Sequence, residues 1–140
     1  VHNLDVEPKR KRKKRKKAKK KLWSKKSDYL CTDGTVVSMD STWEVACAKK
    51  LDDLGIKWYR DPSMKIEYRT QKLRLRKYIP DFYLPDHDIY IEVKGYWTDA
   101  AKWKMKDVMQ RNPGKILILD SLQMIDDITL PISPTTGSIS

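Results

Sequence analysis

The sequence predicts an α/β domain with a central mixed β-sheet flanked by helices, preceded by a basic N-terminal arm. Hydrophobic periodicity follows the order helix, several strands, helix, strand, which suits a sheet with helices packed on its faces. The chain has 140 residues, 39% of them hydrophobic, which is enough for one modest core. Positive charge is concentrated near the N-terminus. We therefore expect an arm at residues 1–30, a folded domain at 31–130 and a flexible tail at 131–140.

The basic arm has Lys or Arg at every position of residues 9–21 except Ala18. Residues 22–140 carry 18 basic and 17 acidic side chains, so the folded part is nearly neutral. A run of like charges repels itself and buries no apolar surface, so we expect the arm to be largely disordered alone. Its natural partner is a polyanion such as DNA, and a nuclear-localisation-type signal is the simpler alternative. The arm residues assigned to DNA binding are Lys9, Arg10, Lys11, Arg12, Lys13, Lys14 and Arg15.

The first element of the domain is predicted to be a helix over residues 41–54. Ser41 suits the N-cap, and Glu44 three residues later completes a capping-box pattern. Gly55 favours the end of the helix, because glycine adopts the left-handed conformation common there. A short strand is expected next, at residues 56–60.

The following stretch is strongly basic. Residues 64–70 alternate apolar and charged side chains, the period of a half-buried strand, and residues 71–77 are expected to continue a strand or form a loop. Cations just before the next strand favour contact with DNA, whereas an exposed edge strand protected by charges is the alternative. The residues assigned to DNA here are Arg69, Lys72, Arg74, Arg76 and Lys77.

The C-terminal part is predicted to contain a hairpin, a helix, a strand and a short helix. The expected ranges are 78–84 and 88–94 for the hairpin strands, 99–110 for the helix, 115–119 for the strand and 121–128 for the last helix. On the helix at 99–110, Lys102 is assigned to the DNA backbone, with a solvated face as the equal alternative.

The hairpin carries charged residues where a plain core strand would not place them. Side chains alternate across a strand, so Glu92 and Lys94 share the face opposite Ile91. A hairpin centred between residues 86 and 87 puts Asp81 opposite Glu92, about 5 Å away. Two carboxylates so close repel each other unless a cation lies between them, and their oxygens suit Mg²⁺ or Mn²⁺. Lys94 can then orient a water or stabilise charge developing on a phosphate.

The motif resembles a known signature. Pro80-Asp81 followed by Glu92-Val93-Lys94 resembles the PD-(D/E)XK pattern of restriction-endonuclease-like nucleases. Residues 41–97, from STWE to EVKGYW, also resemble small phage-encoded enzymes of this superfamily, including homing-type endonucleases. The resemblance implies a restriction-endonuclease-like core. It also implies that the Asp and Glu bind the metal while the Lys positions or activates the attacking water.

Glu44 matches the acid that the superfamily often places on the helix before the sheet. The resemblance thus implies a metal contact for Glu44, while its place in the capping box implies a structural one, and both interpretations stay open. The catalytic residues implied are Asp81, Glu92, Lys94 and Glu44, with Asp81, Glu92 and Glu44 on the metal.

The function implied is a divalent-metal-dependent DNA endonuclease using Mg²⁺, for which Mn²⁺ substitutes. Its expected partner is double-stranded or branched DNA. A structure-selective nuclease such as a Holliday junction resolvase, working as a homodimer, is one alternative. A noncatalytic nucleic-acid-binding protein is the other.

Other classes of function find little support. Cys31 and Cys47 form no CxxC pair and have no zinc-like His spacing, which fits a reducing, cytoplasmic setting. No apolar stretch approaches the length needed to cross a bilayer, so no membrane partner is expected.

Overall fold

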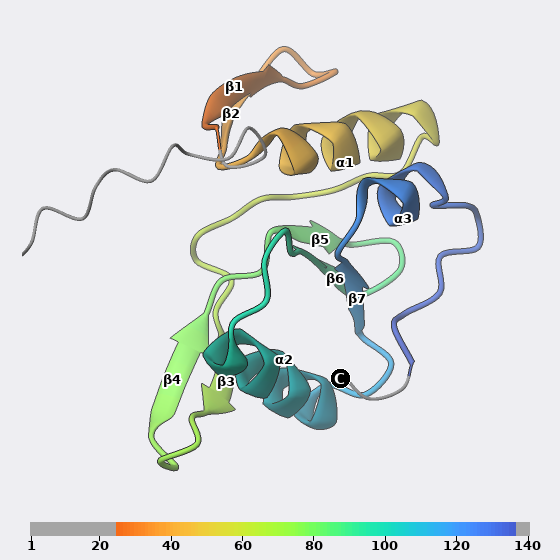
Figure 1. Ribbon diagram of the computed structural model, residues 1–140. Helices are drawn as coiled ribbons and strands as arrows, with labels where there is room; N and C mark the ends of the chain where they lie inside the picture. Colours follow the sequence, from red (N-terminus) through yellow and green to blue (C-terminus); the bar gives the residue numbers. More distant parts are fainter. Residues whose placement is uncertain (1–24, 137–140) are drawn as a thin grey trace, which may run out of the picture.

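The computed structural model describes residues 25–136, which form a mixed α/β structure (Figure 1). The mixed α/β class predicted from the sequence is confirmed. The predicted arm contacts at Lys9–Arg15, and the disorder expected for that segment, lie outside the described residues. The strands are β1 (Ser27–Leu30), β2 (Val36–Met39), β3 (Ile66–Arg69), β4 (Leu75–Tyr78), β5 (Phe82–Leu84), β6 (Ile89–Val93) and β7 (Ile116–Leu119). The helices are α1 (Thr42–Asp53), α2 (Asp99–Arg111) and α3 (Leu122–Asp126).

The described strands form three small sheets. β1 pairs with β2 and β3 with β4, both antiparallel, while β5, β6 and β7 form a three-stranded sheet. In that sheet β5–β6 is antiparallel and β6–β7 is parallel, so the sheet is mixed. α2 lies between β6 and β7 along the chain and makes the connection that a parallel pair requires.

The strand predicted at residues 56–60 is not formed. Tyr59 makes only an isolated bridge to Tyr83. The segment docks on α1 instead: the Ile56 amide donates to the Leu51 carbonyl, and the Trp58 indole donates to Asp52. The first bond takes the Ile56 backbone donor away from a sheet ladder, and the second holds Trp58 against α1, so one strand is lost from the expected sheet.

Two apolar clusters lie around the three-stranded sheet. Ile89 and Ile91 of β6 belong to a cluster with α1, whereas Tyr90 packs against a second cluster that includes Met105 and Val108 of α2. Side chains alternate along β6, so its two faces serve different clusters. Truncating a fully buried core residue such as Ile91 to Ala costs roughly 2–5 kcal/mol. Both faces of β6 are therefore covered by apolar side chains, so burying a charged side chain on either face costs free energy of folding.

The folded part is longer at both ends than predicted. β1 falls within the range assigned to the arm, and its Tyr29 packs against the core while the Tyr29 hydroxyl donates to Asp52. Residues 131–136 fall within the predicted tail, yet Thr135 hydrogen-bonds to Ile116 and Ile118 of β7. Among residues 25–136, no helix has the length and apolar character needed to cross a membrane.

Candidate active site

The Asp81 and Glu92 carboxylates face each other at the end of the β5–β6 hairpin away from its turn. Phe82 pairs with Ile91 and Leu84 with Ile89, so the hairpin centre predicted between residues 86 and 87 is confirmed. Continuing this register by one residue places Asp81 opposite Glu92. The Asp81 amide donates to the Ile91 carbonyl at 3.1 Å, and Asp81 Oδ2 accepts from the Val93 amide at 2.7 Å. Asp81 thus holds the backbone on both sides of Glu92.

Burial and mutual repulsion perturb both carboxylates. Glu92 is 7% exposed, and no hydrogen bond or ion pair holds its carboxylate within the described part of the chain. Burial raises the pKa of Glu92 to about 7; the charge of Glu44 adds to this, while Lys104, Lys94 and Arg60 oppose it. Burial, then the charges of Glu92 and Glu44, raise the pKa of Asp81 well above its usual range. Such a pair favours a proton or a cation between its members.

Glu44 serves as a helix cap and as an ion-pair partner at once. Its amide donates to Ser41 Oγ at 3.1 Å, as the predicted capping box requires, and the Ser41 hydroxyl donates back to Oε2. Glu44 Oε1 lies 2.5 Å from Arg60 Nη1. The side chain is only 8% exposed, so the pair is largely removed from solvent. In this conformation both Glu44 oxygens are engaged by the protein itself.

Arg60 connects the acidic residues of the site, although nothing in the sequence analysis singled it out. Its Nη2 lies 2.9 Å from Asp40 Oδ2, and its Nη1 lies 3.9 Å from Asp81 Oδ1. Nη1 also donates to the Asp81 carbonyl at 3.2 Å. The Tyr59–Tyr83 bridge brings this segment beside β5, which delivers the guanidinium to carboxylates far away in the sequence. The available signal was an arginine directly after the largely hydrophobic stretch Ile-Lys-Trp-Tyr at 56–59.

Two lysines and a tyrosine complete the surroundings of Glu92. The Lys94 amide donates to the Leu119 carbonyl at 2.9 Å, which fixes the backbone of Lys94 beside β7. Lys104 of α2 lies over the Tyr78 ring at 5.2 Å from its centroid. Burial, then the charges of Glu92 and Asp81, raise the pKa of Tyr78. Within residues 25–136, the buried Tyr78 hydroxyl has no hydrogen-bond partner, so an unsatisfied donor lies in the field of the two acids.

Of the described residues predicted to bind DNA, some line a common groove and others do not. Lys72, Arg74 and Arg76, on and beside β4, line one groove together with Lys94 and Lys104. The other three, Arg69, Lys77 and Lys102, do not line it. The Arg69 side chain instead donates to the Leu73 carbonyl at 3.0 Å, within its own hairpin. Lys104, not Lys102, is the cation of α2 that reaches the candidate site. The signal for Lys104 was its place beside the buried face formed by Ala101, Met105 and Val108.

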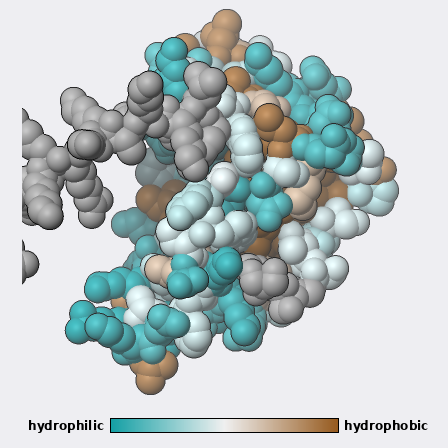
Figure 2. Space-filling view, in the orientation of Figure 1, coloured by the Kyte–Doolittle hydropathy of each residue, from teal (hydrophilic) through white to brown (hydrophobic). Residues whose placement is uncertain are grey.

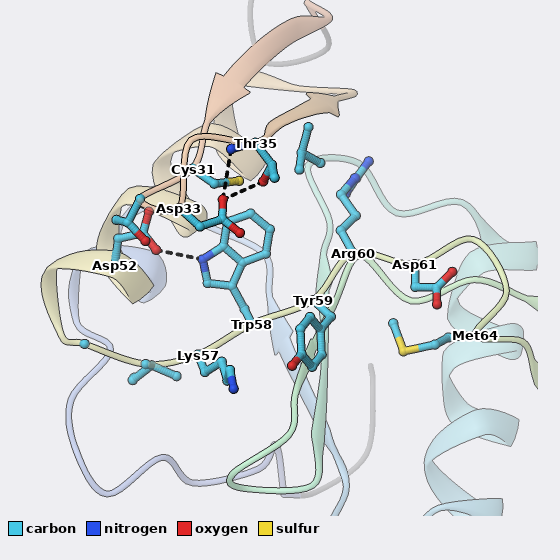
Figure 3. Close-up of a pocket in the computed structure, with 14 residues that line it drawn as sticks. Cys31, Asp33, Thr35, Asp52, Lys57, Trp58, Tyr59, Arg60, Asp61 and Met64 are labelled. Carbon is cyan, nitrogen blue, oxygen red and sulfur yellow. Dashed lines mark hydrogen bonds between the residues drawn. The ribbon is translucent and has the colours of Figure 1, made fainter.

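A cavity larger than this groove lies elsewhere in the described chain. It has a volume of about 730 Å³ and is bounded by the β1–β2 turn, the end of α1 and residues 55–64 (Figure 3). Its acids are held locally: Asp33 accepts from Thr35, and Asp52 accepts from Trp58. Of the candidate-site residues only Arg60 lines this cavity. We therefore place the site at Asp81 and Glu92 and regard the larger cavity as separate.

The carboxylate oxygens around Asp81 meet the requirements of a metal ion only in part. Asp81 and Glu92 offer opposed carboxylates, of which Glu92 is buried and Asp81 half-buried, whereas Glu44 is bound to Arg60. Within residues 25–136, no group of three or more His, Cys, Asp or Glu side chains is arranged to hold a metal ion. Comparison of the chain with protein-family models, curated proteins and solved structures finds no match.

Proposed function

We propose that this protein is a divalent-metal-dependent endodeoxyribonuclease with a PD-(D/E)XK-type site. The observation that carries the proposal is the register of β5 and β6, which sets Asp81 against Glu92 with Lys94 two residues further on. A carboxylate pair with one buried and one half-buried member on a covered sheet face is costly, and a role in holding a cation accounts for it. The cationic groove at Lys94 adds a place for the substrate phosphate.

Asp81 and Glu92 are the residues that would hold Mg²⁺ or Mn²⁺. The buried Tyr78 hydroxyl, which has no hydrogen-bond partner within residues 25–136, lies in the field of both acids and supports a polar ligand there. When bound, the metal ion would polarise the phosphate and lower the pKa of a coordinated water. Glu44 would join the ligands only if Arg60 released it, so its principal role in this conformation is to cap α1 and pair with Arg60.

The chain's own residues would bind the phosphodiester and position it for attack by water. Lys94 and Lys104 lie close enough to lower the pKa of Glu92, and both line the groove. Their positive charge would stabilise the extra negative charge on the phosphate as water adds to phosphorus. The bond from phosphorus to the 3′ oxygen breaks as the attacking water gives up a proton. The departing 3′ oxygen takes up a proton and becomes a hydroxyl, and the phosphate stays on the 5′ oxygen.

The finer fold assignment belongs to the same proposal. In a restriction-endonuclease-like core, helices cover a central mixed sheet on both faces. The β5–β6–β7 sheet, with α1 in the cluster around Ile91 and α2 in the cluster around Tyr90, supports a reduced version of that arrangement. We further propose that the substrate is double-stranded or branched DNA in the cytoplasm, with a homodimer if both strands are cut.

A cleavage assay tests the proposal directly. Supercoiled plasmid and a four-way junction are incubated with the full chain in Mg²⁺, Mn²⁺ or EDTA. We expect cleavage that requires metal and falls at least about 100-fold in Asp81→Asn, Glu92→Gln and Lys94→Met. Asp86→Asn, an exposed turn acid five residues from Asp81, is the matched control and should cut like wild type.

Two further readouts strengthen the test. Calorimetric titration with Mn²⁺ should show binding to wild type and much weaker binding to Glu92→Gln, independently of any cleavage. Preference for the junction over the plasmid would select the resolvase-like branch. DNA binding without cutting in any metal would instead assign the chain to noncatalytic nucleic-acid binding.

A further inference from the structure

A groove of about 540 Å³ lies between the β3–β4 hairpin and the N-terminal half of α2. Five of its lining side chains are cationic: Lys72, Arg74, Arg76, Lys94 and Lys104. No acidic side chain lines it, although the folded part as a whole carries nearly equal numbers of acids and bases. Figure 2 shows hydrophilic side chains gathered over the hairpin region at the lower left. The groove therefore concentrates positive charge that the domain does not have on average.

The charges in the groove are not balanced from within. Across residues 25–136, ion pairs within 4.0 Å engage Arg60, Arg111 and Lys115, but none of the five groove cations. Lys94 and Lys104 are stabilised only at longer range, through Glu92 and the rings of Trp97 and Tyr78. Like charges gathered around one space repel each other, and a polyanion relieves that repulsion by binding and releasing counterions.

Aromatic side chains accompany the cations. Tyr68 of β3 and Trp103 of α2 both line the groove. Trp103 is 39% exposed, while its indole N–H donates to the Arg69 carbonyl at 3.1 Å, which holds the ring in place across the two elements. A fixed, half-exposed ring beside a row of cations is the arrangement on which nucleic-acid bases stack.

The inner end of the groove reaches the candidate active site. Lys94 and Lys104 line the groove and also lie close enough to Glu92 to lower its pKa. The outer end is the hairpin, whose tip is held by hydrogen bonds from Leu73 to Thr70 and from Thr70 to Arg74. The hairpin therefore presents Lys72, Arg74 and Arg76 on an ordered scaffold that leads toward the carboxylates.

We infer that this groove binds one strand of the DNA substrate next to the phosphate that is cut. Lys72, Arg74 and Arg76 contact successive backbone phosphates, Trp103 stacks on a base, and Lys94 and Lys104 receive the reacting phosphate. The last assignment rests on the proposed nuclease function. Binding of the strand by the hairpin and Trp103 stands on the charge and shape of the groove alone.

The test measures binding separately from cleavage. A fluorescein-labelled duplex and the matching single strand are titrated with the full chain in EDTA over a range of salt concentrations. Each phosphate contact contributes about 0.9 to the slope of log K against log salt on duplex DNA. The triple variant Lys72→Gln, Arg74→Gln, Arg76→Gln should lower that slope by about 2–3. The arm contributes equally to every variant and cancels in the comparison.

A matched triple variant controls for the loss of net charge. Lys49→Gln, Lys57→Gln, Lys106→Gln removes three exposed cations that do not line the groove, and its slope should stay within about 1 of wild type. Trp103→Ala should weaken single-strand binding about 5-fold to 100-fold, whereas Trp103→Phe should keep most of it. Circular dichroism shows whether each variant is folded.

The outcomes separate this inference from the proposed function. If the protein cuts DNA only with metal, and the groove triple variant keeps the wild-type salt slope and cleavage rate, the proposed strand-binding role of the groove is wrong. The proposed nuclease function then stands. A lowered slope in a protein that cuts DNA in no metal would support the groove as a strand-binding site and overturn the nuclease. If both triple variants lower the salt slope equally, DNA is attracted by the net charge of the protein and not by the groove. The proposed strand-binding role of the groove would then be wrong.

Discussion

The cavity beside α1 and the groove beside α2 hold their charges in opposite ways. In the larger one, beside α1, each lining acid has a hydrogen-bond donor: Thr35 for Asp33, Trp58 for Asp52 and Ser63 for Asp61. In the smaller one, between the β3–β4 hairpin and α2, five cations lie together without an acid. The acids of the larger cavity are accounted for by donors within the fold, whereas we propose a bound ligand for the cations of the groove.

The candidate active site combines both situations. Arg60 compensates Asp40 and Glu44, whereas Asp81 and Glu92 keep a mutual repulsion that burial makes worse. The ion pairs of Arg60 with Asp40 and Glu44 are part of the packing of the fold. On the function proposed above, the Asp81–Glu92 side would hold a cation that the described residues do not supply. The variants below are ordered from the largest expected effect to the smallest.

Removing the compensating cation should have the largest effect. Arg60→Met leaves the buried Glu44 carboxylate without its compensating cation, and we expect a loss of about 3–5 kcal/mol in the free energy of unfolding at pH 7.5 in EDTA. Urea denaturation measures it. Arg111→Met breaks an exposed pair with Asp107 and should cost less than about 1 kcal/mol. Equal costs for the two variants would show that the Arg60 pair is no more than a surface pair.

Neutralising the uncompensated carboxylate should stabilise the metal-free protein. Because the pKa of Glu92 is raised to about 7, its protonated form stabilises the fold fully below about pH 4.5, and this contribution is lost as pH rises through 7. Glu92→Gln should therefore gain about 1–3 kcal/mol over wild type at pH 8 in EDTA, and little at pH 4.5. Denaturation at both pH values tests this. Glu67→Gln, an exposed acid on β3, should show no such pH dependence.

Disrupting the larger cavity should affect stability alone. Asp52→Ala deprives the Trp58 indole and the Tyr29 hydroxyl of their acceptor, which should cost about 1–2 kcal/mol. DNA binding and metal-dependent cleavage should stay at wild-type levels, measured at a temperature where the variant is fully folded. Asp53→Ala, the exposed neighbour, should change neither property. Loss of cleavage in folded Asp52→Ala would make this cavity part of the functional site.

The smallest effect is expected at the hairpin tip. Leu73 has φ 60° and is 71% exposed, so it holds a left-handed conformation without the packing that usually compensates a leucine. Leu73→Asn should raise the free energy of unfolding by about 0.5 kcal/mol, because asparagine tolerates this conformation better. Unchanged DNA affinity in Leu73→Asn would show that Leu73 does not contact DNA. A lower affinity would add an apolar contact to the proposed strand path.

Local signals predicted much of the fold. The capping box at Ser41 and Glu44, the helix after Thr98 and the hairpin register around residues 86 and 87 all depend on neighbours within a few positions. The errors lie where a distant partner competes. Residues 56–60 were assigned to a strand because their pattern suits one, but hydrogen bonds to α1 outweighed the ladder. The same cause explains Thr135, which β7 holds within a segment predicted to be a loose tail.

The sequence by itself determined the facing of Asp81 and Glu92, since the two-residue period of a strand and the turn at 85–88 suffice to place one opposite the other. It also determined the segregation of charge between the arm and the domain. Only the tertiary structure decided that Arg60 forms an ion pair with Glu44 and that Lys104 and Tyr78 interact electrostatically with Glu92. It also decided that β4 and α2 together form a groove that no acidic side chain lines. The physical reason is range: charge interactions act through space, so their partners are set by packing between elements that no local pattern relates.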